Sequence, residues 1–486
     1  MNALAGHGRT PLVAVATALL CLAGPAWPVA AQPGDAQPGA AQSGNRPPGV
    51  PPPVDLTALP TPVSVSTMPY VVNNTATQQT GPVKQQAPCQ QQVTGGAPDL
   101  EAEPAAQRRL RIRQAQKYAT GRSQRVAVID SGVQPHPRLL GRLIDGGDYI
   151  ENRSGLFDCD GHGTVVAGLI AAAPDAATRF VGVAPAAQIL AIRQASTFYS
   201  VPLRQLEGGQ ATQSPSAGDT VSMAQAVMRA VQLGATVINI SEAACFPAEP
   251  DQVKAPDLQA AVHYAVEHNV VVVVAAANTS STCKQNSPGV VTTISSPGWF
   301  DDDVLTVAAT DENGEPAVFS MHGPWVDVAA PGTGVVSLAA GRPGLTSGLV
   351  DAHGVARALD GTSFATPYVS GLAALVRDRF KNLTARQVMH RIERTAQHTA
   401  GPDGRSEELG YGMIDPVAAL TAVLPEEQGA QAQPVRPARL DGPSPPPPDN
   451  TLPRTVALAG SAAALGLLGL TMVVVQTVKR HRQRPG

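Results

Sequence analysis

The 486-residue chain carries little charge and few aromatic side chains. Asp, Glu, Lys and Arg make up 15% of it, against about 25% in an average soluble protein. With a net charge of −3 it offers no basic surface that would neutralise phosphates, so no nucleic-acid partner is expected. Because aromatic residues make up only 4%, a core must consist mainly of Ala, Val, Leu and Ile, which suits a parallel sheet covered by closely packed helices.

The five cysteines include no CxxC pair, which argues against a zinc site built from cysteines. Cys21 lies in the leader described next, which leaves Cys89, Cys159, Cys245 and Cys283. An even number of cysteines in an oxidising compartment predicts two disulfides. Four cysteines allow three pairings, and the cysteine count leaves all three open.

The N-terminus, residues 1–31, has the layout of a secretory signal peptide. Arg9 precedes an apolar run over residues 11–23, and small residues up to Ala31 offer a cleavage site. The alternative, an uncleaved anchor, is disfavoured because the run is too short to cross a bilayer.

A second apolar segment, residues 455–478, contains no charged side chain and is long enough to cross the ~30 Å hydrocarbon layer. The basic tail that follows, residues 479–486, marks the cytoplasmic side by the positive-inside rule. A buried helix of a soluble domain is the alternative interpretation. The two ends together predict a single-pass protein of the cell membrane whose main domain is extracytoplasmic.

Between these ends, composition divides the chain into an extension, a body and a linker. The Pro- and Gln-rich extension, residues 32–100, contains an apolar patch and Cys89, which suggests that it is tied onto the body, residues 101–422. A Gly-, Ser- and Gln-rich stretch at about residues 199–219 is expected to be an inserted loop. The Pro-rich linker, residues 425–453, could reach at most about 90 Å at about 3.1 Å per residue.

The body alternates strand-like and helix-like segments, which predicts one α/β domain with a mainly parallel sheet flanked by helices. Strands are expected at residues 125–129, 188–193, 236–240, 270–276, 305–309 and 326–329. Helices are expected at residues 104–119, 163–172, 221–233, 256–268, 363–379 and 385–395. The arginines of the first helix are expected to face solvent, and the acidic run 301–303 is interpreted as a solvated turn rather than a calcium site.

Three short segments carry side chains suited to nucleophilic catalysis. Asp130 ends an apolar strand, His162 lies between two glycines before a helix of small residues, and Ser363 starts another helix. A serine hydroxyl is a weak nucleophile unless a base takes its proton, and a neutral histidine whose tautomer is set by a carboxylate can do this near pH 7. A serine at a helix N-terminus also brings backbone N–H groups and the helix dipole to a developing oxyanion.

Each of these residues alone has a simpler interpretation. Asp130 could close a turn, Ser363 could cap a helix, and Asp160 with His162 could ligate a metal. The chain order Asp, His, Ser is the order found in subtilisin, which favours the catalytic interpretation. The sequence therefore predicts neither a metal nor a cofactor.

These segments resemble the signatures of the subtilisin-like serine peptidases, the subtilase family, over about residues 121–420. The segment GTSFATP around Ser363 is the most specific of them. By this resemblance the chain has a subtilisin-like fold, Asp130 orients His162, and His162 acts as general base and then as general acid. Ser363 attacks the scissile carbonyl.

The resemblance implies further site residues beside this triad. Asn278 is placed in the oxyanion hole, although the family usually has glycine where this chain has Ala277, a change that narrows the space near the substrate. Asn239 and Ser241 resemble the edge that binds the substrate backbone. Glu242 stands there in place of a usually apolar residue.

The whole layout resembles the mycosins, membrane-anchored subtilases of actinobacterial type VII secretion systems. The resemblance implies a serine endopeptidase with few protein or peptide substrates and with a type VII secretion membrane complex as its partner. It also implies that disulfides pin the extension and a surface loop, which favours pairing Cys89 with Cys159 and Cys245 with Cys283. The alternative function is a scaffold that stabilises the secretion complex without proteolysis.

Overall fold

The computed structural model describes residues 49–60, 83–89, 102–200, 216–249, 255–428 and 452–482. The predicted signal peptide, most of the inserted loop, most of the linker and residues 483–486 of the basic tail lie outside the described residues.

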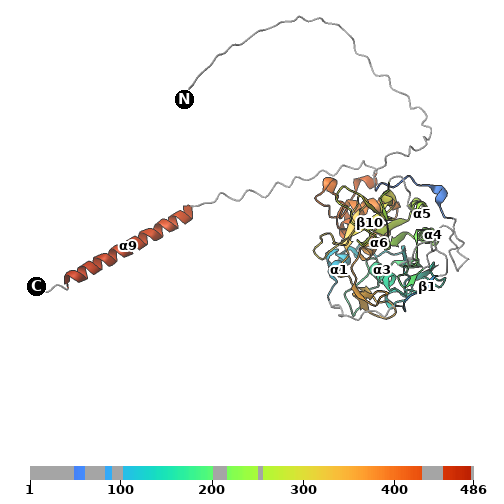
Figure 1. Ribbon diagram of the computed structural model, residues 1–486, viewed down its shortest axis with the longest axis horizontal. Helices are drawn as coiled ribbons and strands as arrows, with labels where there is room; N and C mark the ends of the chain where they lie inside the picture. Colours follow the sequence, from blue (N-terminus) through green and yellow to red (C-terminus); the bar gives the residue numbers. More distant parts are fainter. Residues whose placement is uncertain are drawn as a thin grey trace, which may run out of the picture. The chain divides into compact units, whose positions relative to one another are not determined.

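The body is built around a seven-stranded sheet (Figure 1). In chain order its strands are β2 (Arg125–Asp130), β3 (Leu143–Asp148), β4 (Gln188–Arg193), β6 (Val237–Ile240), β8 (Val271–Ala275), β10 (Leu305–Thr310) and β11 (Val328–Pro331). They lie in the order β11-β10-β8-β6-β2-β4-β3, and every neighbouring pair is parallel. All residues of β6, β8, β10 and β11 are buried, as a sheet covered on both faces requires.

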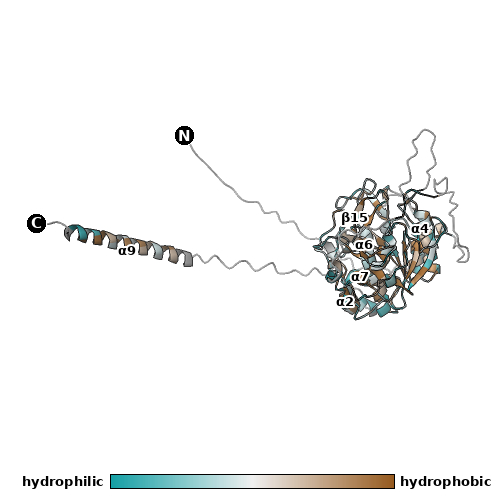
Figure 2. Ribbon diagram, turned by 90° about the horizontal axis from the view of Figure 1, so that it is seen from below, coloured by the Kyte–Doolittle hydropathy of each residue, from teal (hydrophilic) through white to brown (hydrophobic). Residues whose placement is uncertain are grey.

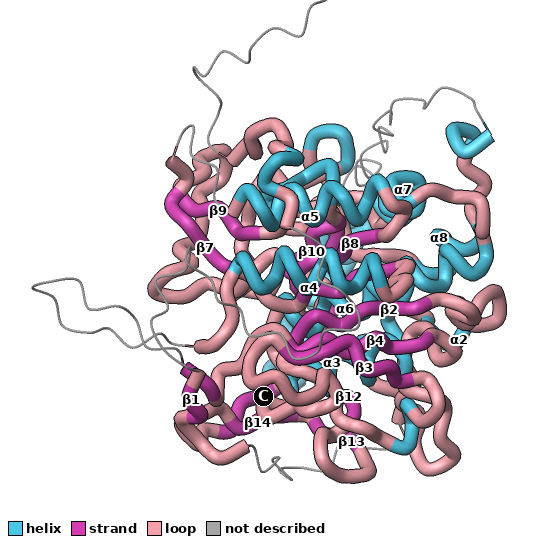
Figure 3. The backbone as a smooth tube through the Cα atoms, turned by 90° about the vertical axis from the view of Figure 1, so that its right-hand side faces the viewer, coloured by secondary structure: helices cyan, strands magenta, loops and turns pink. Residues whose placement is uncertain are grey.

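Helices cover both faces of this sheet (Figure 3). Helices α4 (Thr220–Gln232) and α5 (Pro256–Glu267) run side by side on one face, and α3 (His162–Ala171) packs against α6 (Thr362–Arg379) on the other. Fourteen of the 18 residues of α6 are buried, so this helix forms the centre of its layer. The other helices of the body are α1 (Ala105–Arg109), α2 (Ile112–Ala115), α7 (Ala385–Arg394) and α8 (Pro416–Thr421).

Short elements complete the body. Antiparallel pairs form between β7 (Ala244–Pro247) and β9 (Thr293–Ser296), β12 (Ser337–Leu338) and β13 (Leu345–Thr346), and β14 (Gly348–Val350) and β15 (Ala356–Ala358). The 3-10 turns are η1 (Leu56–Ala58), η2 (Pro137–Leu139), η3 (Gly298–Asp303), η4 (Pro402–Gly404) and η5 (Pro425–Gln428).

The fold class predicted from the sequence is confirmed, and the six predicted strands and five of the six predicted helices begin and end within two residues of the observed ones. Strand β3 was not predicted. Its last four residues, from Asp145 to Asp148, are two glycines between two aspartates, and its pairing with β4 is irregular between Asp145 and Gly147. At the edge of a sheet, such a strand lacks the continuous apolar pattern of the central strands.

The single helix predicted over residues 104–119 is wrong. The chain forms two short helices, α1 and α2, because Arg111 between them has left-handed backbone angles, with φ at 53°. The guanidinium of Arg111 pairs with Asp415, which ties this break to the start of α8. The arginines of this region are exposed, as predicted.

Two segments of the extension contact the body, as the sequence suggested. In residues 49–60, the carbonyl oxygen of Pro52 accepts a hydrogen bond of 2.7 Å from Nε2 of Gln259 on α5. In residues 83–89, strand β1 (Lys84–Gln85) pairs antiparallel with β5 (Tyr199–Ser200). The body therefore holds the described parts of the extension by backbone pairing and by side-chain contacts.

Helix α9 (Leu452–Arg482) follows the body near the C-terminus of the chain. Its stretch Val456–Arg480 has a mean hydropathy of 2.1 and is long and apolar enough to cross a membrane. Figure 2 shows apolar residues along this helix and polar residues at its C-terminal end. The hydroxyls of Ser461, Thr471 and Thr477 each donate to the carbonyl oxygen four residues earlier, so these polar groups are satisfied without water.

Candidate active site

Asp130 and His162 meet at the carboxyl edge of the sheet. Asp130 is the last residue of β2 and is fully buried, and His162 is the first residue of α3. Nδ1 of the histidine lies 2.7 Å from Oδ1 of the aspartate. Since a carboxylate only accepts, we assign the proton to Nδ1, which leaves Nε2 as the basic nitrogen.

The backbone around this pair approaches it unusually closely. The backbone N–H of Ser131 donates to Oδ1 of Asp130 at 2.7 Å. A Cβ atom on Gly163 would lie 2.0 Å from the carbonyl oxygen of Gly132 and 3.1 Å from the same Oδ1. Glycine at position 163 is therefore required for the first turn of α3 to reach the end of β2.

Ser363 faces the same cleft from the first turn of α6. This cleft has a volume of about 520 Å³ and is lined by His162, Ser241, Asn278 and Ser363 among others. The carbonyl oxygen of Ser363 accepts a hydrogen bond of 2.9 Å from Oγ of Ser241. Among the described residues there is no direct hydrogen bond between His162 and Oγ of Ser363, which is common in unliganded sites, where such bonds tighten when substrate binds.

Asn278 follows strand β8 and is held by the start of α6. Its Oδ1 accepts hydrogen bonds of 3.0 Å from both the backbone N–H and the hydroxyl of Thr362. The point where a Cβ on Gly361 would stand lies 3.2 Å from Nδ2 of Asn278 and 3.0 Å from Oγ of Ser363. The amide donor and the hydroxyl thus border one small space, which the absence of a side chain at Gly361 keeps open.

Ala277, where the resemblance leads one to expect glycine, has a φ of 79°. This left-handed conformation costs a residue with a Cβ about 1–2 kcal/mol. The side chain is nearly buried and lines the cleft beside Asn278. The substitution therefore introduces backbone strain and takes up space at the site.

Asn239, which the resemblance placed among the substrate-binding residues, is instead fully buried in β6 and does not line the cleft. Its Nδ2 donates to Oγ of Ser241 at 2.9 Å, and its Oδ1 accepts from Oγ of Ser370 on α6 at 2.8 Å. Ser241 does line the cleft. Asn239 thus connects the sheet to α6 and orients Ser241.

Charges around His162 favour its protonated form. Burial lowers the pKa of His162, but the charge and hydrogen bond of Asp130 and the charges of Glu242 and Asp158 outweigh this and raise that pKa above its usual 6.5. Burial also raises the pKa of Asp158 to about 7 and that of Glu242 to about 7. The site therefore stabilises an imidazolium, the form that a histidine base takes after accepting a proton.

One group of possible metal ligands occurs among the described residues. Ligand atoms of Asp130, His162 and Glu242 lie within 4.8 Å of one another, but Asp130 and His162 already share a hydrogen bond. Asp160, the other sequence candidate, has its oxygens occupied by hydrogen bonds from Thr197 and from Ser196.

Two disulfides lie near the cleft. Cys89 of the extension is bonded to Cys159, directly before Asp160, and Cys245 of β7 is bonded to Cys283, which lines the cleft. These are the pairs that the resemblance favours. They fix the extension and one cleft wall to the body.

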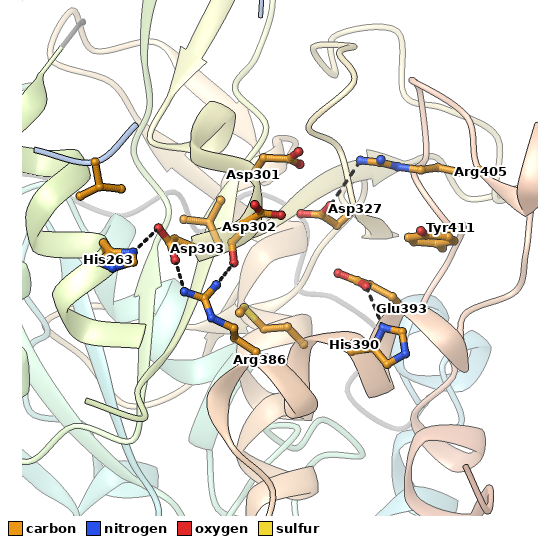
Figure 4. Close-up of a pocket in the computed structure, with 13 residues that line it drawn as sticks. His263, Asp301, Asp302, Asp303, Asp327, Arg386, His390, Glu393, Arg405 and Tyr411 are labelled. Atoms are coloured by element: carbon orange, nitrogen blue, oxygen red, sulfur yellow. Dashed lines mark hydrogen bonds and ion pairs between the residues drawn. The ribbon is translucent and has the colours of Figure 1, made fainter. Parts of the chain in front are cut away.

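A larger cavity of about 660 Å³ lies elsewhere and is lined by acidic residues, arginines and histidines (Figure 4). Its lining includes the acidic run at the end of η3, where Asp301 and Asp302 are exposed, as expected of a solvated turn, and only Asp303 departs from that expectation. Asp303 is buried and pairs with His263 at 2.9 Å and with Arg386 at 2.7 Å. No serine, threonine or cysteine lies among the described residues that line this cavity.

The subtilase family matches residues 121–412. Mycosin-3 of Mycobacterium tuberculosis is 41% identical over 83% of this chain and 89% of its own length. The chain belongs to the mycosins, within the subtilase family of serine peptidases. The resemblance seen in the sequence is thereby confirmed.

Solved structures of mycosins superpose on this chain. The crystal structure of MycP1 from Mycobacterium smegmatis is 39% identical, covers 79% of this chain and 98% of its own, and has a TM-score of 0.68. A chain of the intact ESX-5 inner membrane complex is 36% identical, covers 88% of this chain and 99% of its own, and has a TM-score of 0.67.

Some features of this mycosin site were not found from its sequence. The bond from Ser241 to the carbonyl of Ser363 and the support of Ser241 by Asn239 join distant segments and leave no local pattern. Asp158 holds the loop before α3 through Gly161 and Thr164. The only sequence signal for this role of Asp158 was its position two residues before Asp160, in a stretch that has few other charged residues.

Proposed function

We propose that this mycosin is a membrane-anchored serine endopeptidase that uses Asp130, His162 and Ser363 as its catalytic triad. One observation carries the proposal. His162, which is bonded to the buried Asp130, lines one cleft together with a serine at the N-terminal turn of a buried helix.

The first step of the reaction follows from this arrangement. Nε2 of His162 takes the hydroxyl proton of Ser363 while Oγ forms a bond to the scissile carbonyl carbon. Asp130 keeps the ring in the tautomer that exposes Nε2, and its negative charge stabilises the imidazolium. The same nitrogen then gives the proton to the leaving amine. In the second half of the reaction His162 takes a proton from water, the water oxygen attacks the acyl carbon, and the proton returns to Oγ of Ser363 as the acid product leaves.

Charge on the carbonyl oxygen is stabilised by two donors. One is Nδ2 of Asn278, whose orientation is set by the two bonds that Oδ1 accepts from Thr362. The other is the backbone N–H of Ser363, since the first N–H groups of a helix have no partner within it. The dipole of α6 adds to both.

The anchor and the partner belong to the same proposal. The apolar helix α9 fits a single span, with the peptidase domain extracytoplasmic and the linker between them. Because a relative of 36% identity is part of the ESX-5 inner membrane complex, we place this chain in a type VII secretion membrane complex. The strained, space-filling Ala277 supports a narrow range of protein substrates.

Labelling with a serine-directed fluorophosphonate tests the triad. We expect one adduct, located on Ser363 by mass spectrometry, and none in Ser363→Ala. A folded wild-type protein that stays unlabelled, or an adduct on another serine, would overturn the assignment.

A second candidate function is a scaffold role, which the membership of a relative in a membrane complex favours. In a deletion strain, Ser363→Ala that restores secretion, while a form lacking residues 454–486 does not, supports the scaffold. If Ser363→Ala fails to restore secretion while the form lacking residues 454–486 restores it, the scaffold role is excluded.

A further inference from the structure

A small pocket of about 170 Å³ adjoins the catalytic cleft and shares part of its wall. The shared residues include Glu242 and Ala243, which follow directly after Ser241. The far side of the pocket carries apolar surface from Met223 of α4 and Leu258 of α5. A side chain of a peptide bound in the cleft can therefore enter the pocket.

Two buried polar groups of this pocket lack a partner. Gln194 is 2% exposed, and its Nε2 donates to the carbonyl oxygen of Asp219 at 3.0 Å and to Oγ of Ser222 at 2.9 Å. Because a carbonyl only accepts, this contact fixes the amide orientation and leaves Oε1 as an acceptor. Within the described part of the chain, neither this Oε1 nor Oγ of Ser296, which is 1% exposed, has a hydrogen-bond partner.

Glu242 adds a negative charge to these acceptors. Its half-buried carboxylate makes no hydrogen bond and no ion pair with any residue that the structure describes. The pocket also contains Asp219, which caps α4 through the N–H of Ser222. No Lys, Arg or His occurs among the described residues that line this pocket, so its own lining is negative. His162, which has a ring nitrogen within 4.8 Å of a carboxylate oxygen of Glu242, lines the catalytic cleft instead.

The ligand that fits is a cation with hydrogen-bond donors and an apolar stem. A lysine ammonium offers three N–H donors and an arginine guanidinium five, and neither can accept. Their methylene chains pack on apolar surface while the charged head reaches polar groups. Here Met223 and Leu258 would contact the stem, and Glu242, Gln194 and Ser296 would contact the head.

We propose that this pocket is a substrate subsite for a lysine or arginine side chain, with Glu242 as its specificity-determining residue. The peptidase then prefers proteins with a basic residue at one fixed position near the scissile bond. This inference rests on the proposed function, because it names the substrate class of the same site.

The titration of Glu242 sets the pH at which the subsite is charged. Burial and the charges of Asp130 and Asp160 raise its pKa, the charge of His162 lowers it, and together they bring it to about 7. The carboxylate is therefore ionised above that pH. The preference for a basic residue is expected to strengthen as the pH rises from 6 to 8.

Peptide cleavage by the full-length, detergent-solubilised protein tests the subsite. Quenched fluorescent peptides carry a single lysine at successive positions around the scissile bond, each matched by norleucine, which keeps the stem without the charge. We expect kcat/KM to be about tenfold higher for lysine at one position, as charge-assisted hydrogen bonds allow. Glu242→Gln should bring this ratio close to one, and the exposed control Glu408→Gln should keep it. A ratio of one in the wild type, or an unchanged ratio in Glu242→Gln, would overturn the inference.

Binding separates the subsite from catalysis. With Ser363→Ala, fluorescence anisotropy should show tighter binding of the lysine peptide than of the norleucine peptide, and the Ser363→Ala/Glu242→Gln double variant should bind both equally. Selective binding without hydrolysis by the wild type would contradict the proposed function and leave the subsite intact. Hydrolysis by the wild type together with equal binding of the lysine and norleucine peptides would support the proposed function and contradict the subsite.

Discussion

Two Asp–His pairs lie at opposite edges of the central sheet. Asp130 ends β2 at the carboxyl edge and lies 2.7 Å from Nδ1 of His162. Asp303 stands just before β10 begins, at the amino edge, and lies 2.9 Å from Nδ1 of His263 (Figure 4). Both aspartates are buried. Distance and burial alone therefore do not distinguish the two pairs.

The surroundings of the two pairs differ. At the carboxyl edge, His162 lines a cleft together with Ser363 and Asn278. The pair at the amino edge contacts Arg386, which also binds Glu267 and so joins α7 to α5. In open parallel sheets ligands bind outside the carboxyl ends of the strands, where diverging connections leave a crevice. The pair at the amino edge also lines a cavity, but no serine, threonine or cysteine occurs among the described residues around it. The comparison shows that a polar pair becomes a candidate for catalysis only where the topology also supplies a nucleophile.

The largest expected difference between the pairs is in catalysis. His162→Ala should lower kcat by about 10⁴-fold or more, because the base for Ser363 is removed. His263→Ala, the matched variant at the amino edge, should change kcat by less than about threefold. Both are measured on one quenched peptide. Equal losses in the two variants would show that the comparison is wrong.

The next largest effect is expected at Asn278, the proposed oxyanion donor, which only the pair at the carboxyl edge has beside it. Asn278→Ala should lower kcat by about 10²–10³-fold, with little change in KM, because the bond to the oxyanion forms mainly in the transition state. Asn313→Ala, in an exposed turn, serves as the control. A rise in KM with kcat unchanged would place Asn278 in ground-state binding instead.

The pH profile of kcat/KM distinguishes the pairs next. The raised pKa of His162 means that the neutral base forms only as the pH rises, so activity should increase toward alkaline pH. The negative charge of Glu242 contributes to that increase in pKa, so Glu242→Gln should move the rising limb to lower pH. Glu267→Gln, close to the other pair, should leave the profile unmoved. A shift to higher pH in Glu242→Gln would contradict the electrostatic account.

The smallest expected effect concerns stability at the amino edge. Asp303→Asn weakens the contacts with His263 and Arg386, and we expect a loss of about 1 kcal/mol in the free energy of unfolding. Urea unfolding followed by circular dichroism measures this, and kcat should stay near the wild-type value. A large loss of kcat in a folded variant would give the amino-edge pair a function that its surroundings do not suggest.

Much of this architecture could be predicted from sequence because its signals are local. Apolar runs such as the one in β8 mark strands buried on both faces, and Asp130, His162 and Ser363 each stand at the end or start of a recognisable element. Strand β3 could not be predicted because its glycines and acidic residues interrupt the apolar pattern. The break between α1 and α2 at Arg111 could not be predicted because an arginine with left-handed backbone angles has no sequence signature.

The sequence by itself determined the alternation of strands and helices, the apolar helix and the residues that the cleft brings together. These depend on hydrophobic periodicity and on short motifs, which act within a few residues along the chain. Only the tertiary structure decided that Asn239 is buried away from substrate, and that Glu242 joins Gln194 and Ser296 around one pocket. Such contacts depend on how β6, α4 and β9 pack against one another, and no local pattern specifies that packing.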